Sequence, residues 1–341
     1  MIYIVKHKIY FILILLLGLT NIAFAGKESK KGTAGALELL IPVGARGAAL
    51  GNSTISYAKG IEAVSWNPSG IVNTQNNIEL YFARNNYIAD ISLNNAAISA
   101  NINGFGSIAL NIRSLDLGSI EETTEDYPEG TGNYFSPVFF NVGLSYARRI
   151  TDRLNTGFTV KFIQEKIFRT SAYGIGFDAG IQYFAGNTGL IFGIVLKNIG
   201  PAMKFEGTDL EREIQISTIH PTTRTVVVKS NPFDLPSSLE LGFAYQKSIT
   251  NSNNIILSGA FENNNYGNDL YKAGLEYSYN DNLFLRVGYI LVPEELVYIY
   301  QYTYGFGLKY SISGIEFAID YAYRPIKYFG SNSIINVQIN F

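Results

Sequence analysis

The chain has 341 residues, no cysteine, and a formal net charge of −2 from 26 Lys and Arg against 28 Asp and Glu. The lack of cysteine excludes a disulfide framework and a thiolate metal site, and the balanced charge gives no basic surface for nucleic acid. Charged residues make up only 16% of the chain while aromatic residues reach 14%, which is atypical of a soluble secreted protein.

Residues 1–25 have the pattern of a secretory signal peptide. A basic start at 6–8 precedes an apolar run at 10–19, and Ala23-Phe24-Ala25 is a small-x-small cleavage site. The alternative is an N-terminal membrane helix, but the apolar run is shorter than the roughly 20 residues that a spanning helix needs. We therefore predict a signal peptide at 1–25 and a mature chain that starts near Gly26.

Residues 26–77 separate this signal from the rest of the chain and lack strand alternation. Within them, residues 44–70 are rich in glycine and alanine and end in Trp66-Asn67-Pro68-Ser69-Gly70, which holds the only tryptophan. A stretch of this kind between an export signal and a sheet is either a linker or a plug around which the sheet closes.

From residue 78 onward, large apolar and small or charged side chains alternate with a period of two, which indicates strands. The runs reach about 9–13 residues, which matches a tilted membrane strand better than the strands of a soluble sheet. A secreted β-sandwich or β-helix is the alternative. We predict about fourteen strands: 78–86, 90–101, 105–115, 135–149, 153–168, 172–184, 188–198, 237–248, 253–263, 270–280, 282–292, 299–310, 314–324 and 332–341.

The connections between these strands alternate in length, which is typical of outer-membrane barrels with short periplasmic turns and longer external loops. Both long connections, 116–134 and 199–236, follow odd-numbered strands. We therefore predict an all-β transmembrane antiparallel barrel of about 14 strands at 78–341, located in the cell outer membrane. Because the strand count is even, we expect both termini to be periplasmic.

The smaller face of the strands carries charges of both signs, which we expect to point into the lumen. These include Asp178, Lys197, Glu240, Glu276, Arg286, Lys309, Glu316 and Asp320. They form either a selectivity lining for a substrate path or a mixed-sign network that pairs with itself and holds a plug. The balance of signs favours the second, since like-signed rings are typical of ion-selective pores.

No catalytic constellation or cofactor motif is present, and we predict that the protein is not an enzyme. His220 is the only histidine of the mature chain and there is no Gly-x-Ser-x-Gly, so neither a serine hydrolase nor a histidine metal site is expected. The segment 199–236 is an external hairpin or lid. Long loops on a rigid scaffold often carry binding, so it is either a partner surface or an ordinary solvated loop.

Two N-terminal motifs carry a resemblance to a known family. Residues Pro42–Gly51 and Ala63–Ile71 resemble the N-terminal signature of the PorV/PorQ family, which is similar to the FadL-type outer-membrane proteins. The related proteins carry Asn-Pro-Ala-Gly, where this chain has Ser69 in place of alanine. Asn198-Ile199-Gly200 and Leu235-Pro236 also resemble the family.

The resemblance implies a 14-stranded barrel with an N-terminal hatch in the periplasmic end of the lumen. It also implies a link to type IX secretion, in which PorV-type members bind the C-terminal signal domains of secreted proteins and PorQ-type members anchor surface components. We therefore expect a binding, shuttle or scaffold component whose external loops 116–134 and 199–236 contact secreted proteins or surface components. A FadL-like channel for small hydrophobic molecules is the second hypothesis, and an open porin the third.

The hatch interpretation of residues 26–77 follows from the size of the barrel. Roughly eight strands already fill with side chains alone, so about fourteen need additional filling, whereas a linker needs neither tryptophan nor proline. We expect Arg46 to pair with an inward carboxylate such as Asp178, Glu240 or Glu316. The candidate hatch residues are Arg46, Gly51, Trp66, Asn67, Pro68 and Gly70.

Overall fold

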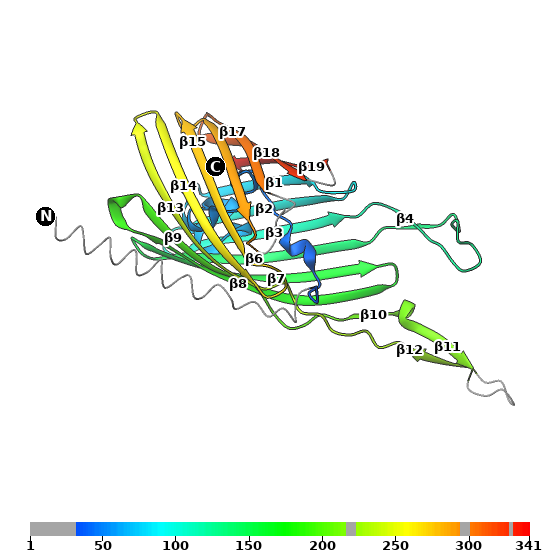
Figure 1. Ribbon diagram of the computed structural model, residues 1–341. Helices are drawn as coiled ribbons and strands as arrows, with labels where there is room; N and C mark the ends of the chain where they lie inside the picture. Colours follow the sequence, from blue (N-terminus) through cyan, green and yellow to red (C-terminus); the bar gives the residue numbers. More distant parts are fainter. Residues whose placement is uncertain (1–31, 216–222, 294–300, 327–329) are drawn as a thin grey trace.

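The computed structural model describes residues 32–215, 223–293, 301–326 and 330–341. The predicted signal peptide at 1–25, the start of the leader at 26–31 and His220 lie outside the described residues. Fourteen strands of the described chain form one antiparallel barrel (Figure 1). They are β1 (Ile78–Asn86), β2 (Ser92–Ile102), β3 (Gly106–Asp116), β6 (Val138–Thr151), β7 (Leu154–Ile167), β8 (Thr170–Phe184), β9 (Leu190–Ile199), β13 (Ser238–Thr250), β14 (Asn253–Asn264), β15 (Leu270–Tyr279), β16 (Leu283–Leu291), β17 (Tyr302–Ile312), β18 (Ile315–Ile326) and β19 (Gly330–Asn340).

The barrel is closed, because β1 pairs with β19 and β8 pairs with β9. Closure leaves no unpaired strand edge, which a sheet in hydrocarbon requires since no water is there to satisfy its backbone groups. The predicted fold class and strand number are confirmed. The first strand also has its predicted bounds, Ile78–Asn86.

The outer wall is apolar and the inner wall is polar, as β8 illustrates. Tyr173 and Phe177 point outward and are 58% and 47% exposed, whereas Asp178 and Gln182 point inward and are buried. Large apolar side chains on an exposed outer face fit contact with lipid. Among the described residues, no helix has the length and apolar character to cross a membrane.

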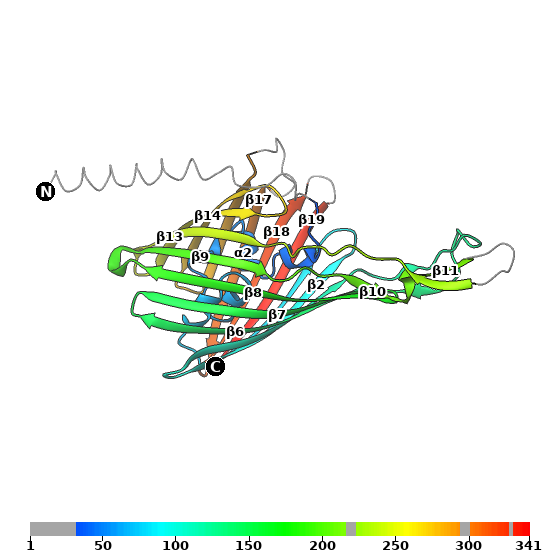
Figure 2. The same cartoon turned by 90° about the horizontal axis from the view of Figure 1, so that it is seen from below.

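The two ends of the barrel differ in their connections. At one end, the turn end, short turns join β2 to β3, β6 to β7, β13 to β14 and β17 to β18, and the η6 turn (Gly186–Thr188) joins β8 to β9. At the other, the loop end, two long connections project as hairpins (Figures 1 and 2). The first pairs β4 (Ile120–Glu121) with β5 (Tyr134–Phe135); the second holds β10 (Phe205–Gly207) and η7 (Thr208–Leu210), then β11 (Glu211–Gln215) paired with β12 (Thr223–Val227).

Residues 32–77, here called the lumen segment, run inside the barrel (Figures 1 and 2). Their helical turns are η2 (Leu37–Leu40), α2 (Ala45–Ala49), η3 (Thr54–Ser56), η4 (Gly60–Ser65) and η5 (Pro68–Val72). The turns other than η2 contact thirteen of the strands between them, and Arg46 reaches the remaining strand, β15, through Glu276. The segment therefore fills the lumen against the whole circumference of the wall.

The lumen segment crosses the barrel from the loop end to the turn end. Gly32 N–H donates to Tyr266 O (3.4 Å), in the β14–β15 connection, and Gly35 N–H donates to Asp234 O (3.1 Å), in the long connection before β13. At the opposite end, Phe341 N–H donates to Ile78 O (2.9 Å).

Gly32 and Phe341 therefore lie at opposite ends of the barrel, while the N-terminus itself lies outside the described residues, so the location of both termini on one side stays a prediction. The even strand count places Ile78 and Phe341 together, but it says nothing of a segment that passes through the lumen before the first strand begins. The resemblance implied a hatch at one end of the lumen, the periplasmic end. The described segment instead extends from the loop end to the turn end.

We expect Ile194→Arg to destabilise the barrel by about 2–4 kcal/mol in lipid vesicles, because it places a charge in the middle of the outward apolar band of β9. Ile194 is 46% exposed on this outer face. Urea unfolding of the reconstituted protein measures the effect. The control is Val228→Arg, at an equally exposed position (50%) in the long connection before β13. Equal destabilisation by both variants would contradict the assignment of the outer wall to lipid.

Candidate functional site in the barrel lumen

A chain of ion pairs joins the lumen segment to the barrel wall. Arg46 in α2 donates to both carboxylate oxygens of Glu276 on β15, at 2.8 Å each, and its third contact is Glu62 Oε2 in η4 at 3.3 Å. Arg286 on β16 donates to Glu276 Oε2 (2.6 Å) and to Asp320 Oδ1 on β18 (2.6 Å). The carboxylate of Glu276 on the wall thus accepts from Arg46 of the segment and from Arg286 of the wall.

The same network returns to the backbone of the lumen segment. Asn336 on β19 donates to Asp320 Oδ2 (3.0 Å), and Asn336 Oδ1 accepts the N–H of Ala45 (2.8 Å), the first residue of α2. α2 is therefore held through its first N–H and through the side chain of its second residue. Removing Arg46 from this buried network would leave Glu62 without its cationic partner.

As predicted, Arg46 pairs with carboxylates in the lumen. Its partners are Glu276 and Glu62, whereas the examples named from the sequence were Asp178, Glu240 and Glu316. The two carboxylates offset the cost of burying the guanidinium of Arg46. The guanidinium carries a permanent charge, and its burial in the lumen is tolerated because these acidic partners pair with it.

Asn67 anchors a second region of the segment to the opposite side of the wall. It is fully buried, and its Nδ2 donates to Ile55 O (2.9 Å) within the segment and to Ile181 O (3.1 Å) on β8. Its Oδ1 accepts the N–H (3.2 Å) and the hydroxyl (2.7 Å) of Ser69, which caps η5 with Pro68 at the first helical position. One amide thus starts the η5 turn and fixes it to the sheet.

Glycines in the wall allow η5 to approach the strands closely. A Cβ at Gly180 on β8 would overlap Asn67 Oδ1, and one at Gly157 on β7 would lie 2.5 Å from the Pro68 carbonyl carbon. These two glycines are direct partners across β7 and β8. Inside the segment, a Cβ at Gly70 would overlap Ala58 O. The motif and the inner wall are therefore complementary in shape.

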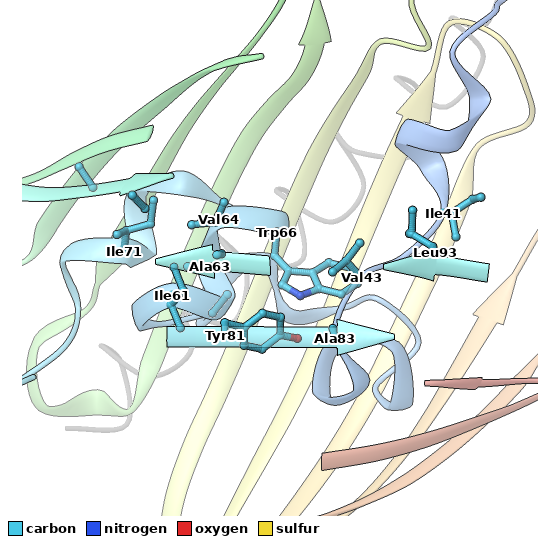
Figure 3. Close-up of a cluster of buried hydrophobic side chains, with 14 of the residues drawn as sticks. Ile41, Val43, Ile61, Ala63, Val64, Trp66, Ile71, Tyr81, Ala83 and Leu93 are labelled. Atoms are coloured by element: carbon cyan, nitrogen blue, oxygen red, sulfur yellow. The ribbon is translucent and has the colours of Figure 1, made fainter. Parts of the chain in front are cut away.

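Trp66 lies in the largest apolar cluster of the lumen (Figure 3). It is 5% exposed and packs with Val43 of the segment and Tyr81 of β1. Lys197 Nζ on β9 lies 5.7 Å from the centre of its ring, within the range of a cation–π contact. Gly51, with φ 62°, donates its N–H to Thr303 Oγ1 on β17 (3.1 Å).

The other predicted lumen charges also have partners. Lys197 and Lys272 share Glu240 at 2.7 and 3.0 Å, and Lys309 pairs with Glu316 at 2.5 Å. Lys161 pairs with Asp178 at 2.7 Å. In this arrangement, the positive and negative side chains of the wall neutralise one another within the lumen.

Several residues of the site were not predicted: Glu62, Gln182, Thr303 and Asn336. Alternation places the last three on the inward face, but it does not show which part of the segment each one meets. Gln182 Nε2, for example, donates to Ala58 O (2.9 Å). The described residues contain no group of three or more His, Asp or Glu side chains placed to hold a metal ion.

Near the loop end, the lumen segment buries a carboxyl group beside a second one. Glu38 in η2 and Glu165 on β7 are 3% and 5% exposed, and Arg113 on β3 is the nearby cation. Burial, followed by the proximity of Glu165, raises the pKa of Glu38 to about 8. Burial beside a second carboxylate therefore favours the protonated form of Glu38.

Comparison with known families identifies the chain. Residues 24–261 match the family described as Type IX secretion system protein PorV. The chain belongs to the PorV family. The match includes the whole lumen segment, the first eight barrel strands and most of β14, while β15 to β19 lie beyond it. No curated protein matches the chain.

Solved structures support the fold of this PorV family member at low sequence identity. The CymD monoaromatic hydrocarbon channel is 14% identical, with a TM-score of 0.51 over 89% of this chain and 98% of that one. The toluene transporter TodX of Pseudomonas putida is 13% identical, with a TM-score of 0.51 over 86% and 96%. The chain thus has the fold of these outer-membrane channels, and its family membership and barrel fold together make it an outer-membrane β-barrel.

We expect Gly180→Ala to destabilise the protein by about 1–3 kcal/mol, because the new methyl group overpacks against Asn67. Thermal unfolding measures the loss, and the emission of the only tryptophan, Trp66, reports displacement of the segment. Gly176→Ala on the same face of β8 is the control, since its Cβ would meet Ile163 at 3.4 Å, an ordinary contact. If both variants behave alike, close packing of the motif against β8 is not what holds the segment.

The raised pKa of Glu38 predicts that residues 36–41 loosen as the pH rises. The folded-state pKa of about 8 lies above the ordinary 4.5, so the stabilising contribution is complete below pH 4.5 and is lost as pH rises through about 8. Hydrogen–deuterium exchange between pH 6 and 9, corrected for intrinsic rates, should show falling protection at 36–41 but not at 68–72. Because Glu38 lies beside the buried Glu165, the double variant Glu38→Gln with Glu165→Gln should abolish the dependence; a dependence that persists in it would refute the assignment.

Proposed function

We propose that the protein is a non-enzymatic outer-membrane binding component for protein secretion, which holds its partner at the loop end of the barrel. Secreted proteins or surface components of a type IX pathway are the proposed partners, and the PorV family membership supports this choice. The observation that carries the proposal is that both long connections form projecting hairpins with exposed apolar side chains.

Both hairpins expose large apolar side chains. Val227, Val228 and Ile214 are 67%, 50% and 46% exposed, and Tyr127 and Tyr134 of the first long connection are 62% and 63% exposed. Exposed apolar side chains gathered on projecting loops are typical of surfaces that bind other proteins. A secreted domain that docks here would cover side chains that otherwise face water.

Residues 26–77 serve as the leader and hatch in this proposal, and the loop end faces the cell exterior because longer loops are external in such barrels. The C-terminus then lies on the periplasmic side, and Gly32 lies on the external side. The ion pairs and the Asn67 hydrogen bonds keep the hatch in place, so that the barrel acts as a holder and not as an open pore.

A FadL-like channel for small hydrophobic molecules is the second candidate. The likeness of the fold to CymD, a monoaromatic hydrocarbon channel, and to TodX, a toluene transporter, favours it. In that case the hatch would shift to open a route, and substitution of Arg46 or Asn67 would change uptake of an aromatic hydrocarbon in intact cells.

Replacing residues 205–229 with a short Gly-Ser linker should abolish co-purification of a secreted protein that carries its C-terminal signal domain. The matched point variant is Val227→Asp combined with Val228→Asp, which should weaken capture because it places charges in the apolar contact. Asn187→Asp, in a turn at the opposite end, is the control and should capture as the wild type does.

Hydrocarbon uptake measured in the same strains separates the two candidates. Unchanged capture by the linker variant would rule out this hairpin as the docking site. If capture is unchanged and uptake is lost on substitution of Arg46, the channel is the better description.

A further inference from the structure

On the neighbouring strands β19, β1, β2 and β3, the apolar band on the outer wall ends before the strands reach the loop end. On β8, outward side chains are apolar or aromatic all the way from Tyr183 to Tyr173. On β1 they are apolar only from Ile78 to Phe82, and the next outward residue is Arg84. The band therefore ends early on this side of the loop-end half.

The strand register aligns further polar residues with this arginine. Arg84 is the partner of Asn94 on β2, and Asn94 is the partner of Ser114 on β3. One position closer to the loop end, Asn86 donates to Ser333 Oγ on β19 (3.3 Å). The outer wall thus carries a polar row where neighbouring strands remain apolar.

A groove lies directly below this row. It has a volume of about 430 Å³, and its lining includes Phe82, Ala96, Ile112 and Val337, with Arg84 and Asn94 at its loop-side end. Ala96 is the register partner of both Phe82 and Ile112, so its short side chain leaves a hollow between two large ones. The groove is therefore apolar along its length and cationic at one end.

Arg84 has no carboxylate partner to neutralise it. Its only hydrogen bond among the described residues runs from Nε to Asn86 Oδ1 (3.2 Å), and it forms no ion pair with any of them. The outward carboxylate of Asp116, two strands away, accepts the N–H of Gly118. An arginine on the lipid face is destabilising, most of all at mid-bilayer, so a fixed anion beside it would be stabilising.

We propose that this groove binds one anionic lipid from the leaflet at the loop end, with an acyl chain over Ala96 and the headgroup phosphate on Arg84. The guanidinium presents parallel donors that fit a phosphate in bidentate fashion, and Asn94 and Ser114 supply further polar contacts. A transmembrane segment of a protein would instead have to bring its own carboxylate to this depth. The proposal rests on the membrane location of the barrel and not on a role in secretion.

Native mass spectrometry of the detergent-purified mature protein tests the site with three probes: phosphatidylglycerol, lipid A and zwitterionic phosphatidylcholine. The wild type should retain the anionic probes over phosphatidylcholine. Arg84→Gln should weaken their binding about tenfold, the effect of losing one charged hydrogen-bonding group. Whichever of the two anionic probes, phosphatidylglycerol or lipid A, binds more tightly identifies the source of the phosphate.

Arg148→Gln is the matched control, because Arg148 is an exposed outward arginine of β6 at the turn end, and it should bind as the wild type does. Ala96→Leu keeps the wall apolar but fills the groove, so it should also weaken binding of the anionic probes. This variant tests the site if Arg84→Gln fails to fold. Equal binding by wild type and Arg84→Gln overturns the proposal. So does equal loss in Arg148→Gln, or retention of phosphatidylcholine as strong as that of phosphatidylglycerol.

Discussion

The size of the barrel is the constraint on which the rest of the structure depends. About eight strands enclose a space that their own side chains can fill, and this barrel has fourteen. Its outer wall faces lipid, so the packing that stabilises a soluble core has to come from the lumen. The lumen segment supplies that packing, and the inner wall is adapted to it by glycines at 157 and 180 and by polar side chains such as Gln182 and Asn336.

Electrostatics inside the barrel follow from the same constraint. A buried charge is tolerated only when it is paired and hydrogen-bonded. Glu276 accepts from both Arg46 and Arg286, so a single carboxylate of the wall links the segment to β15 and β16, and Asp320 extends the network to β18. Because these charges neutralise one another across the boundary between segment and wall, the network acts as an attachment. Rings of like-signed charges along an open lumen would instead be typical of an ion-selective pore.

The sequence was sufficient to predict the barrel, because a period of two is a local property that each strand displays independently. It also showed which residues face inward, including Asp178, Glu240 and Glu276. It could not show which of these carboxylates meets Arg46, because the path of a segment without alternation depends on contacts across the lumen. The direction of that path was missed for the same reason: the strand count fixes Ile78 and Phe341 at one end, while Gly32 is fixed by hydrogen bonds to the loops.

The passage of the lumen segment from one end of the barrel to the other constrains the order of assembly. The sheet becomes a ring when β1 meets β19, the first and last strands of the chain. If the ring closed first, residues 32–72 would have to be drawn lengthwise through an interior whose side chains bind them at each level. Closure around a segment already in position requires no such translocation. The segment then serves as a template on which the sheet curves, and the final strand pairing both completes the ring and traps its contents.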